Sequence, residues 1–535
     1  MRYTIYNIAS KYTGILLGIF FIYLSIDTQF STYINQDIAW NIHVASQIYD
    51  GKKLYIDFFD PNPPLIFYYS MLPVLLSDIT NIELIASSHI TDIYIALFCI
   101  FITLFTFRYT KYSQDKIFSN LFDVTVCLVI FILPLCSWAN SFFNKDVMVI
   151  PFILPYLLLS INRLDDIHST PNLFIKIIIG LMAGFAFSIK PFFISLFIVI
   201  ELAIYIKHRK IEIIKNIEVL TSALFIFIYL ISIFIITPEY TTHTLPIINF
   251  THPLFTNRPE IVLLFFSSLI IVPLASLILV YLVKPCEFTR LFSLIVMTLL
   301  VISLVQNKGW VYHAYPAIAL GYIIIIKIIS DILGNHKNKI KKYNSAQIIK
   351  SISIISIIAI IAYGGIYKSH IRFHNLYNSN ELEEKYSIKA INKIINKSDK
   401  DTPNILILSE YLHHAYPAIF YSKGKSSFSL PFLFPLTAIE NYKYIYKDIP
   451  EEEASRDLKP IKDFMFKQIN SYIKLYKPDI IISRDYANFH LRRVKEDINI
   501  VEYLKKENTE FGNLIDDYNL DTDSIHIPYN AYYLK

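Results

Sequence analysis

Residues 35–69 of the chain read NQDIAWNIHVASQIYDGKKLYIDFFDPNPPLIFYY. The stretch combines carboxylates, paired prolines and aromatic rings, and strongly apolar segments lie on both sides of it. Its apolar residues recur at helical spacing up to the turn signal Asp50-Gly51, which predicts an amphipathic helix over 38–49. Because so many of its side chains are apolar, we expect the stretch to lie on a bilayer surface with its carboxylates facing the headgroups.

The composition is that of a polytopic membrane protein. Of the 535 residues, 54% are hydrophobic and only 12 are glycine, and the mean hydropathy is +0.44. Soluble chains are far less apolar. The net charge of +5 is modest, and the basic residues lie in short loops between apolar segments. They therefore report orientation, and we expect no nucleic-acid partner.

About eleven apolar segments are long enough to cross a bilayer, which takes roughly 20 residues. They lie near 12–30, 83–107, 118–139, 147–162, 173–189, 192–206, 217–236, 260–283, 290–306, 311–330 and 347–366. The apolar segment at 63–76 is too short to cross a bilayer and begins with two prolines. It is therefore predicted to form an interfacial or re-entrant helix. We expect a transmembrane domain over 1–366, with a first loop at 31–82, and a soluble domain over 367–535.

The soluble domain alternates amphipathic segments with short apolar runs at 405–409, 479–483 and 525–533, which predicts a small α/β fold. Short cytoplasmic loops are enriched in Lys and Arg. Alternate loops of this chain meet that rule, for example the one that holds Lys207, Arg209 and Lys210. The pattern predicts a multi-pass protein of the cytoplasmic membrane, with a cytoplasmic N-terminus and an extracytoplasmic C-terminal domain.

Charged residues predicted near the outer face are the candidates for chemistry, because charges at membrane depth are costly and usually pair or react. They are Asp37, Asp57, Asp60, Asp146, Lys190, Arg258, Lys308 and His313. Each has a plainer alternative, such as a helix cap, a turn or an interfacial aromatic belt with an anchoring lysine. Together they suit sugar transfer from a phosphate leaving group. A carboxylate would take the acceptor proton, and cations would hold the developing phosphate charge.

The order of these features resembles the GT-C superfamily of integral-membrane glycosyltransferases. The resemblance rests on the first apolar segment, on Asp37, on GKKLYID at 51–57 and on PPLIFYY at 63–69. Within the superfamily it is nearest to bacterial protein O-mannosyltransferases, lipid A aminoarabinose transferases and lipopolysaccharide galacturonic acid transferases. It implies that Asp37 is the catalytic residue and that Asp146 is the second acidic residue.

The resemblance also implies an inverting enzyme with a polyprenyl-phosphate sugar as donor and a lipid, glycan or protein as acceptor, working among membrane lipids. Many members carry a lysine before the paired prolines, where this chain has Asn62. That departure shifts the expected phosphate contact to Lys308 or Lys190. We expect no cofactor and assign no metal ion, although a divalent cation held by Asp37, Asp57 and Asp146 stays open.

The alternative from another class is a transporter or lipid flippase, in which intramembrane charges line a pathway. Such proteins tend to show inverted repeats and glycine-broken helices, which we do not find in the sequence. One short repeat is present, since YHAYPA at 312–317 recurs as HHAYPA at 413–418. Chance accounts for it, unless His313 serves the donor and His414 the acceptor.

Overall fold

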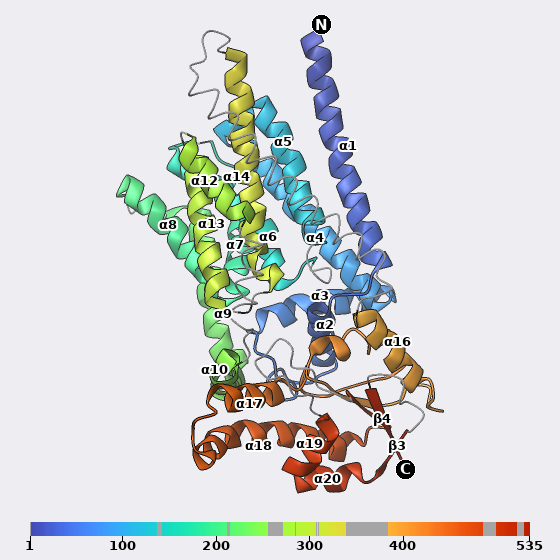
Figure 1. The fold of residues 1–535 in the computed structure, drawn as a ribbon. Helices are drawn as coiled ribbons and strands as arrows, with labels where there is room; N and C mark the ends of the chain where they lie inside the picture. Colours follow the sequence, from blue (N-terminus) through green and yellow to red (C-terminus); the bar gives the residue numbers. More distant parts are fainter. Residues whose placement is uncertain are drawn as a thin grey trace. The chain divides into compact units, whose positions relative to one another are not determined.

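The computed structural model describes residues 2–135, 142–167, 169–210, 215–254, 271–283, 285–306, 308, 310–338, 383–484, 499–521 and 529–535. The chain, drawn in Figure 1, divides into two compact units. The first comprises Met1–Thr32, His89–Ile231 and Val262–Tyr377. The second comprises Tyr33–Ser88, Ser232–Ile261 and Asn378–Lys535. The predicted domain boundary near 366 lies outside the described residues.

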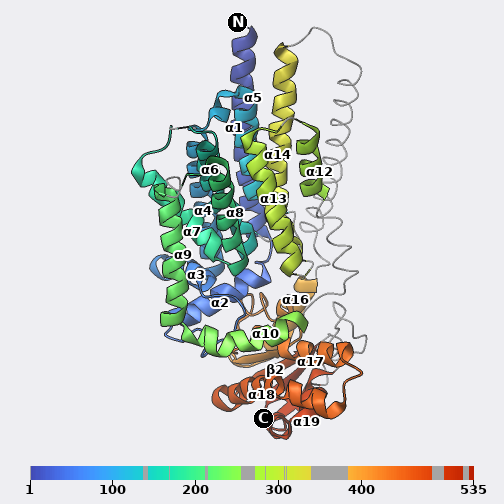
Figure 2. The same cartoon turned by 90° about the vertical axis from the view of Figure 1, so that its left-hand side faces the viewer.

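Apolar helices make up the first unit. They are α1 (Arg2–Ser31), α4 (Leu84–Phe107, from His89 onward), α5 (Lys116–Cys127), α6 (Lys145–Leu164), α7 (Leu173–Ser188), α8 (Ile194–His208), α9 (Ile217–Ile236, up to Ile231), α12 (Ile271–Leu282), α13 (Glu287–Gln306) and α14 (Val311–Asn338). Helices α12, α13 and α14 lie side by side (Figures 1 and 2). Among the described residues, seven helices are long and apolar enough to cross a membrane. The predicted polytopic helical class is confirmed, whereas the count of eleven spans stays a prediction.

Helices α7 and α9 approach each other closely at two glycines of α7. A Cβ atom added at Gly180 would lie 2.6 Å from the Cβ atom of Thr221, and one added at Gly184 would lie 2.6 Å from the Cβ atom of Phe225. The hydroxyl of Ser222 also donates to the carbonyl of Gly180 (2.9 Å). Small residues four apart allow this kind of backbone approach between membrane helices.

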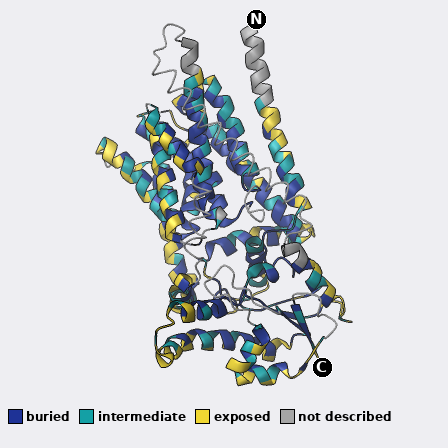
Figure 3. Cartoon of the chain, in the orientation of Figure 1, coloured by how far each residue is buried: buried dark blue, intermediate teal, exposed yellow. Residues whose placement is uncertain are grey.

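Burial differs between the helices of this unit. Almost all of α6 is buried, whereas α8 and α9 expose large apolar side chains along one side (Figure 3). Exposed examples are Leu202 on α8 and Phe227 on α9. Helices that face lipid expose apolar side chains of this kind, so α6 is the central helix around which the others pack.

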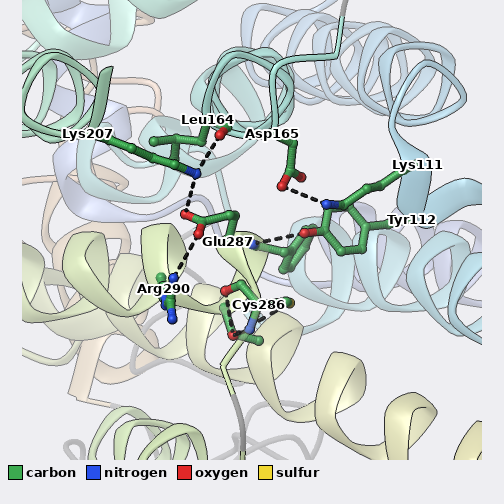
Figure 4. A network of polar contacts seen from close by, with 10 residues as sticks. Lys111, Tyr112, Leu164, Asp165, Lys207, Cys286, Glu287 and Arg290 are labelled. Carbon is green, nitrogen blue, oxygen red and sulfur yellow. Dashed lines mark hydrogen bonds and ion pairs between the residues drawn. The ribbon is translucent and has the colours of Figure 1, made fainter. Parts of the chain in front are cut away.

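Polar contacts gather where α6 ends and α13 begins (Figure 4). Lys207 donates to the carbonyl of Leu164 (2.6 Å) and pairs with Glu287 (3.3 Å). Lys111 pairs with Asp165 (2.6 Å), the C-cap of α6. These basic residues come from the loops predicted to be cytoplasmic. Their contacts tie the ends of α6, α8 and α13 together.

A four-stranded sheet forms the centre of the second unit. Strands β1 (Ile405–Leu408) and β2 (Ile480–Arg484) are parallel, and the order is β1-β2-β4-β3 with β3 at Tyr518–Leu520 and β4 at Tyr529–Leu534. Parallel neighbours need a crossover. Helices α17 (Phe434–Ile445) and α18 (Glu451–Tyr476) provide it. The predicted α/β fold is confirmed.

Helix α16 (Glu383–Ile395) precedes the sheet, and α19 (Ile500–Glu507) and α20 (Thr509–Ile515) follow β2. The amphipathic pattern near 486–506 also predicts a helix, and the structure describes that segment only from residue 499. Helix α10 (Leu245–Leu254) also belongs to this unit, and the sequence analysis missed it, as it missed β3.

The first loop belongs to the same compact unit as the sheet. It contains α2 (Gln36–Tyr49) and α3 (Leu65–Thr80), in agreement with the predicted helices. Phe59 of the loop enters the apolar core of the unit, where its ring stacks on Phe434 (5.2 Å). The amide of Phe59 also donates to the carbonyl of Ser429 (2.8 Å). The loop that decides the fold is thus packed into the C-terminal α/β domain.

Candidate functional site

Asp37 lies in the first turn of α2. The side chain of Asn35 caps this helix by accepting a hydrogen bond from the amide of Asp37 (2.9 Å). A carboxylate in a first turn is stabilised by the positive end of the helix dipole. The capping role is therefore met by Asn35, and Asp37 stands beside the cap with its residue partly exposed. This placement leaves the base assignment as a prediction.

Asp57 and Asp60 organise the turns of the first loop. Asp57 is exposed and accepts a hydrogen bond from the amide of Lys53 (2.7 Å). Asp60 is buried and accepts from the indole of Trp40 (2.7 Å) and from the amide and the side chain of Asn62 (both 2.7 Å). Asp60 thus fixes the Pro-Asn-Pro-Pro turn to α2. These contacts favour the turn-forming alternative for both carboxylates.

An aromatic cluster surrounds His43 of α2. The ring of His43 lies 5.8 Å from Trp40, 6.1 Å from Phe58 and 5.1 Å from Tyr416 of the C-terminal domain. Burial, with a smaller contribution from Lys52, lowers the pKa of His43 to about 3. His43 is therefore neutral at physiological pH and packs as an aromatic ring.

In the first unit, Asp146 and Lys190 meet. The ammonium of Lys190 donates to Asp146 Oδ2 (2.5 Å) and to Gln306 Oε1 (3.1 Å), and all three side chains are buried. They come from the start of α6, the turn before α8 and the last residue of α13. Three segments predicted to lie on one face of the bilayer thus converge on one buried ion pair.

Lys308 and His313 follow Gln306 along the chain and are also buried. The backbone carbonyl of His313 accepts a hydrogen bond from Ser303 (2.6 Å), and the His313 ring lies 5.3 Å from Trp310. Arg258 lies outside the described residues. The described part of the chain holds no group of three or more His, Cys, Asp or Glu side chains placed to share a metal ion.

Comparison with known proteins gives a likeness in structure alone. No protein-family model matches the sequence, and no curated protein is similar to it in sequence. The structure is similar to that of ArnT from Cupriavidus metallidurans bound to undecaprenyl phosphate, with a TM-score of 0.53 and 11% identity over 97% of this chain and 97% of that chain. The chain shares the fold of that protein, in agreement with the predicted GT-C-like fold class.

Two weaker similarities are to ArnT from C. metallidurans in the apo state and to the Archaeoglobus fulgidus oligosaccharyltransferase tethered to an acceptor peptide containing the NVT sequon. The first has a TM-score of 0.49 and 12% identity over 87% of this chain and 92% of that chain. The second has a TM-score of 0.46 and 12% identity over 90% of this chain and 70% of that chain.

Sequence reasoning missed two residues that contact the predicted site residues. Gln306 accepts a hydrogen bond from Lys190 beside Asp146. The sequence feature that could have indicated this role is a polar residue at the end of a predicted span. Trp40 donates to Asp60. The sequence feature that could have indicated this role is a large ring with a donor group on the apolar face of the predicted helix. Neither signal identifies the partner, because both partners are distant in sequence.

Proposed function

We propose that this chain is a membrane glycosyltransferase that moves a sugar from a polyprenyl-phosphate-linked donor to an envelope lipid, glycan or protein. One observation carries the proposal. The chain shares its fold over 97% of its length with a protein whose structure holds undecaprenyl phosphate. The basic-loop pattern supports the cytoplasmic membrane as its location, with the C-terminal domain on the outer side.

Asp37 is proposed as the general base. Its carboxylate takes the proton from the acceptor hydroxyl, and the acceptor oxygen attacks the anomeric carbon on the side opposite the phosphate. The bond from that carbon to the phosphate oxygen breaks, the polyprenyl phosphate leaves with the electron pair, and the anomeric configuration is inverted. General-base catalysis contributes about 10²–10⁴-fold. Among the first-loop carboxylates, Asp57 and Asp60 hold turns, which favours Asp37 for this role.

Lys190, Lys308 and His313 are proposed to hold the phosphate charge that develops as the donor bond breaks. Lys190 is a compact point charge on a flexible stem, so it can exchange one anionic partner for another. Asp146 keeps that ammonium in place at 2.5 Å. We assign Asp146 the task of orienting Lys190, and we assign no step to a metal ion.

Mass spectrometry of envelope lipids and glycans tests the proposal. Membranes with the wild-type chain, without it and with Asp37→Asn are compared, and Asp78→Asn serves as the control because Asp78 is an exposed carboxylate of α3. We expect one sugar-bearing species that disappears without the chain and with Asp37→Asn, a loss of at least about 100-fold. Identical envelopes with and without the chain would contradict the function, and wild-type product from Asp37→Asn would contradict the base.

A further inference from the structure

The C-terminal domain contacts the backbone just before Asp37. The hydroxyl of Tyr421 accepts a hydrogen bond from the amide of Ile34 (3.1 Å), and the Tyr421 ring packs edge-on against Tyr33 (4.8 Å). Ile34 is buried and directly precedes the helix cap Asn35. A buried amide that loses its acceptor is unfavourable. Tyr421 therefore fixes the chain three residues before Asp37.

A second contact lies three residues after Asp37. The ring of Tyr416 packs edge-on against Trp40 (5.2 Å), and Trp40 donates to the buried Asp60. Residues three or four apart lie on the same side of a helix, so Trp40 is the neighbour of Asp37 on α2. Tyr421 and Tyr416 thus contact the chain before and after Asp37, respectively.

The segment that carries both tyrosines is itself held in the α/β domain. Asn392 of α16 donates to the carbonyl of Tyr421 (2.9 Å). His414 contacts Tyr529 through Nδ1 (2.7 Å) and Arg484 through Nε2 (2.6 Å), and Arg484 pairs with the buried Glu410 (2.7 Å). Glu410 lies just beyond the end of β1 and Arg484 ends β2, so the parallel strands set the position of the segment.

The tautomer of His414 follows from its partners. Burial, and then the nearby His413 and Arg484, lower the pKa of His414, so its ring is neutral. Arg484 can only donate, so Nε2 accepts and Nδ1–H donates to the Tyr529 hydroxyl. That hydroxyl in turn donates to Ser387 (2.7 Å). Both nitrogens are engaged, which favours a positioning role for His414 over the predicted contact with an acceptor.

We propose that residues 411–421 of the C-terminal domain position the catalytic turn of the first loop, with Tyr421 as the positioning residue for Asp37. The inference rests on the proposed function. It assigns the C-terminal domain a part in the chemical step, in which it sets where the Asp37 carboxylate stands relative to the acceptor hydroxyl. A misplacement of about 1 Å in a catalytic group can cost about 100-fold in rate.

Tyr421→Phe tests the inference because it removes only the hydroxyl and keeps the ring on Tyr33. In purified full-length protein with polyprenyl-phosphate sugar as donor, we expect kcat to fall about tenfold with the donor KM unchanged. The melting temperature in detergent falls because the Ile34 amide loses its acceptor, but the folded fraction at the assay temperature stays at the wild-type value. Tyr444→Phe is the matched control, since Tyr444 is an exposed tyrosine of the same domain.

A double variant separates positioning from general damage. If Tyr421 acts through Asp37, Tyr421→Phe lowers the residual rate of Asp37→Asn by less than about twofold, because residues that act as a unit are non-additive. An unchanged kcat in Tyr421→Phe alone, or the same tenfold loss in both backgrounds, overturns the inference. A fall in kcat that matches a fall in the folded fraction also overturns it. Wild-type activity in Asp37→Asn instead overturns the base assignment.

Discussion

Helix α6 carries a buried charge at each end, and both charges pair with the segment that contains α8. At its start, Asp146 binds Lys190. At its other end, Arg163 binds Glu201 with N–O distances of 2.7 and 2.8 Å. With 20 residues the helix is about 30 Å long, the thickness of a hydrocarbon core. The same two segments are thus joined twice, by different chemistry.

The pair at Arg163 is closed in the sense that both carboxylate oxygens of Glu201 are bound. The guanidinium forks onto both oxygens of Glu201 and also donates to Ser160 (2.8 Å). The Tyr156 hydroxyl donates to Glu201 as well (2.5 Å), and Glu218 lies 3.7 Å from the guanidinium. Bidentate Arg–carboxylate geometry fixes orientation as well as charge. Every oxygen of Glu201 is occupied from within the protein.

The pair at Lys190 is open in the sense that the ammonium binds only one carboxylate oxygen of Asp146. Asp146 gives one oxygen to Lys190, and its other oxygen has no hydrogen-bond partner among the described residues. The same holds for Nε2 of Gln306 within that part of the chain. Nε of Arg163 and Oε2 of Glu218 also have no hydrogen-bond partner among the described residues, so the two pairs differ in geometry, which is bidentate at Arg163 and monodentate at Lys190. An arginine fork fixes both carboxylate oxygens, whereas a lysine leaves one of them, so under the proposed function a lysine suits the end that binds the donor phosphate.

The largest effect is expected from removing the arginine. Arg163→Met leaves Glu201 and Glu218 buried without their cation, which destabilises by about 3–5 kcal/mol. Transfer per folded molecule stays near the wild-type value. Thermal unfolding in detergent measures the loss, and Arg290→Met is the control because Arg290 forms an exposed pair with Glu287 worth about 0–1 kcal/mol. An Arg163→Met protein as stable as wild type would show that the Arg163–Glu201 pair does not hold the helices together.

Next in size is the loss of activity at the other end. Asp146→Asn combined with Lys190→Met removes both charges together, so stability changes by only about 1 kcal/mol. Transfer falls by about 100-fold or more, because the phosphate loses its fixed cation. The matched control removes both charges at the tie, Arg163→Met with Glu201→Gln, and should retain transfer in the fraction that folds. If the first double variant retained transfer, both ion pairs would serve only to hold the helices together.

Much of this architecture could be predicted from sequence because it depends on local signals. The helix over 38–49 followed from apolar spacing and the Asp50-Gly51 turn, and it forms as α2. The apolar runs at 405–409 and 479–483 form β1 and β2. Each signal lies within the element that it predicts, so no knowledge of a distant partner was needed.

The pairings could not be predicted, because they depend on residues far apart in the chain. Nothing in the sequence near Asp146 indicates that Lys190 is its partner, and the joining of Trp40 to Tyr416 spans most of the chain. Helix α10 was missed because prolines and histidines obscure its apolar pattern. The glycine contact of Gly180 and Gly184 with α9 was missed because only the structure identifies the helix that they face.

The smallest effect is expected from a substitution that keeps every charge and changes only the geometry of the pair. Lys190→Arg places a fork at the open pair, where it can bind both oxygens of Asp146 as Arg163 binds those of Glu201. We expect the protein to be at least as stable as wild type in a detergent melt, while transfer falls about tenfold because the cation is held by Asp146 and meets the phosphate less well. The donor KM and kcat are measured together with the melt. Arg163→Lys is the reciprocal control, and it should lower the melting temperature and leave transfer per folded molecule unchanged. If Lys190→Arg transfers sugar at the wild-type rate, charge alone is enough at that end, and the distinction between fork and point charge does not account for the two pairs.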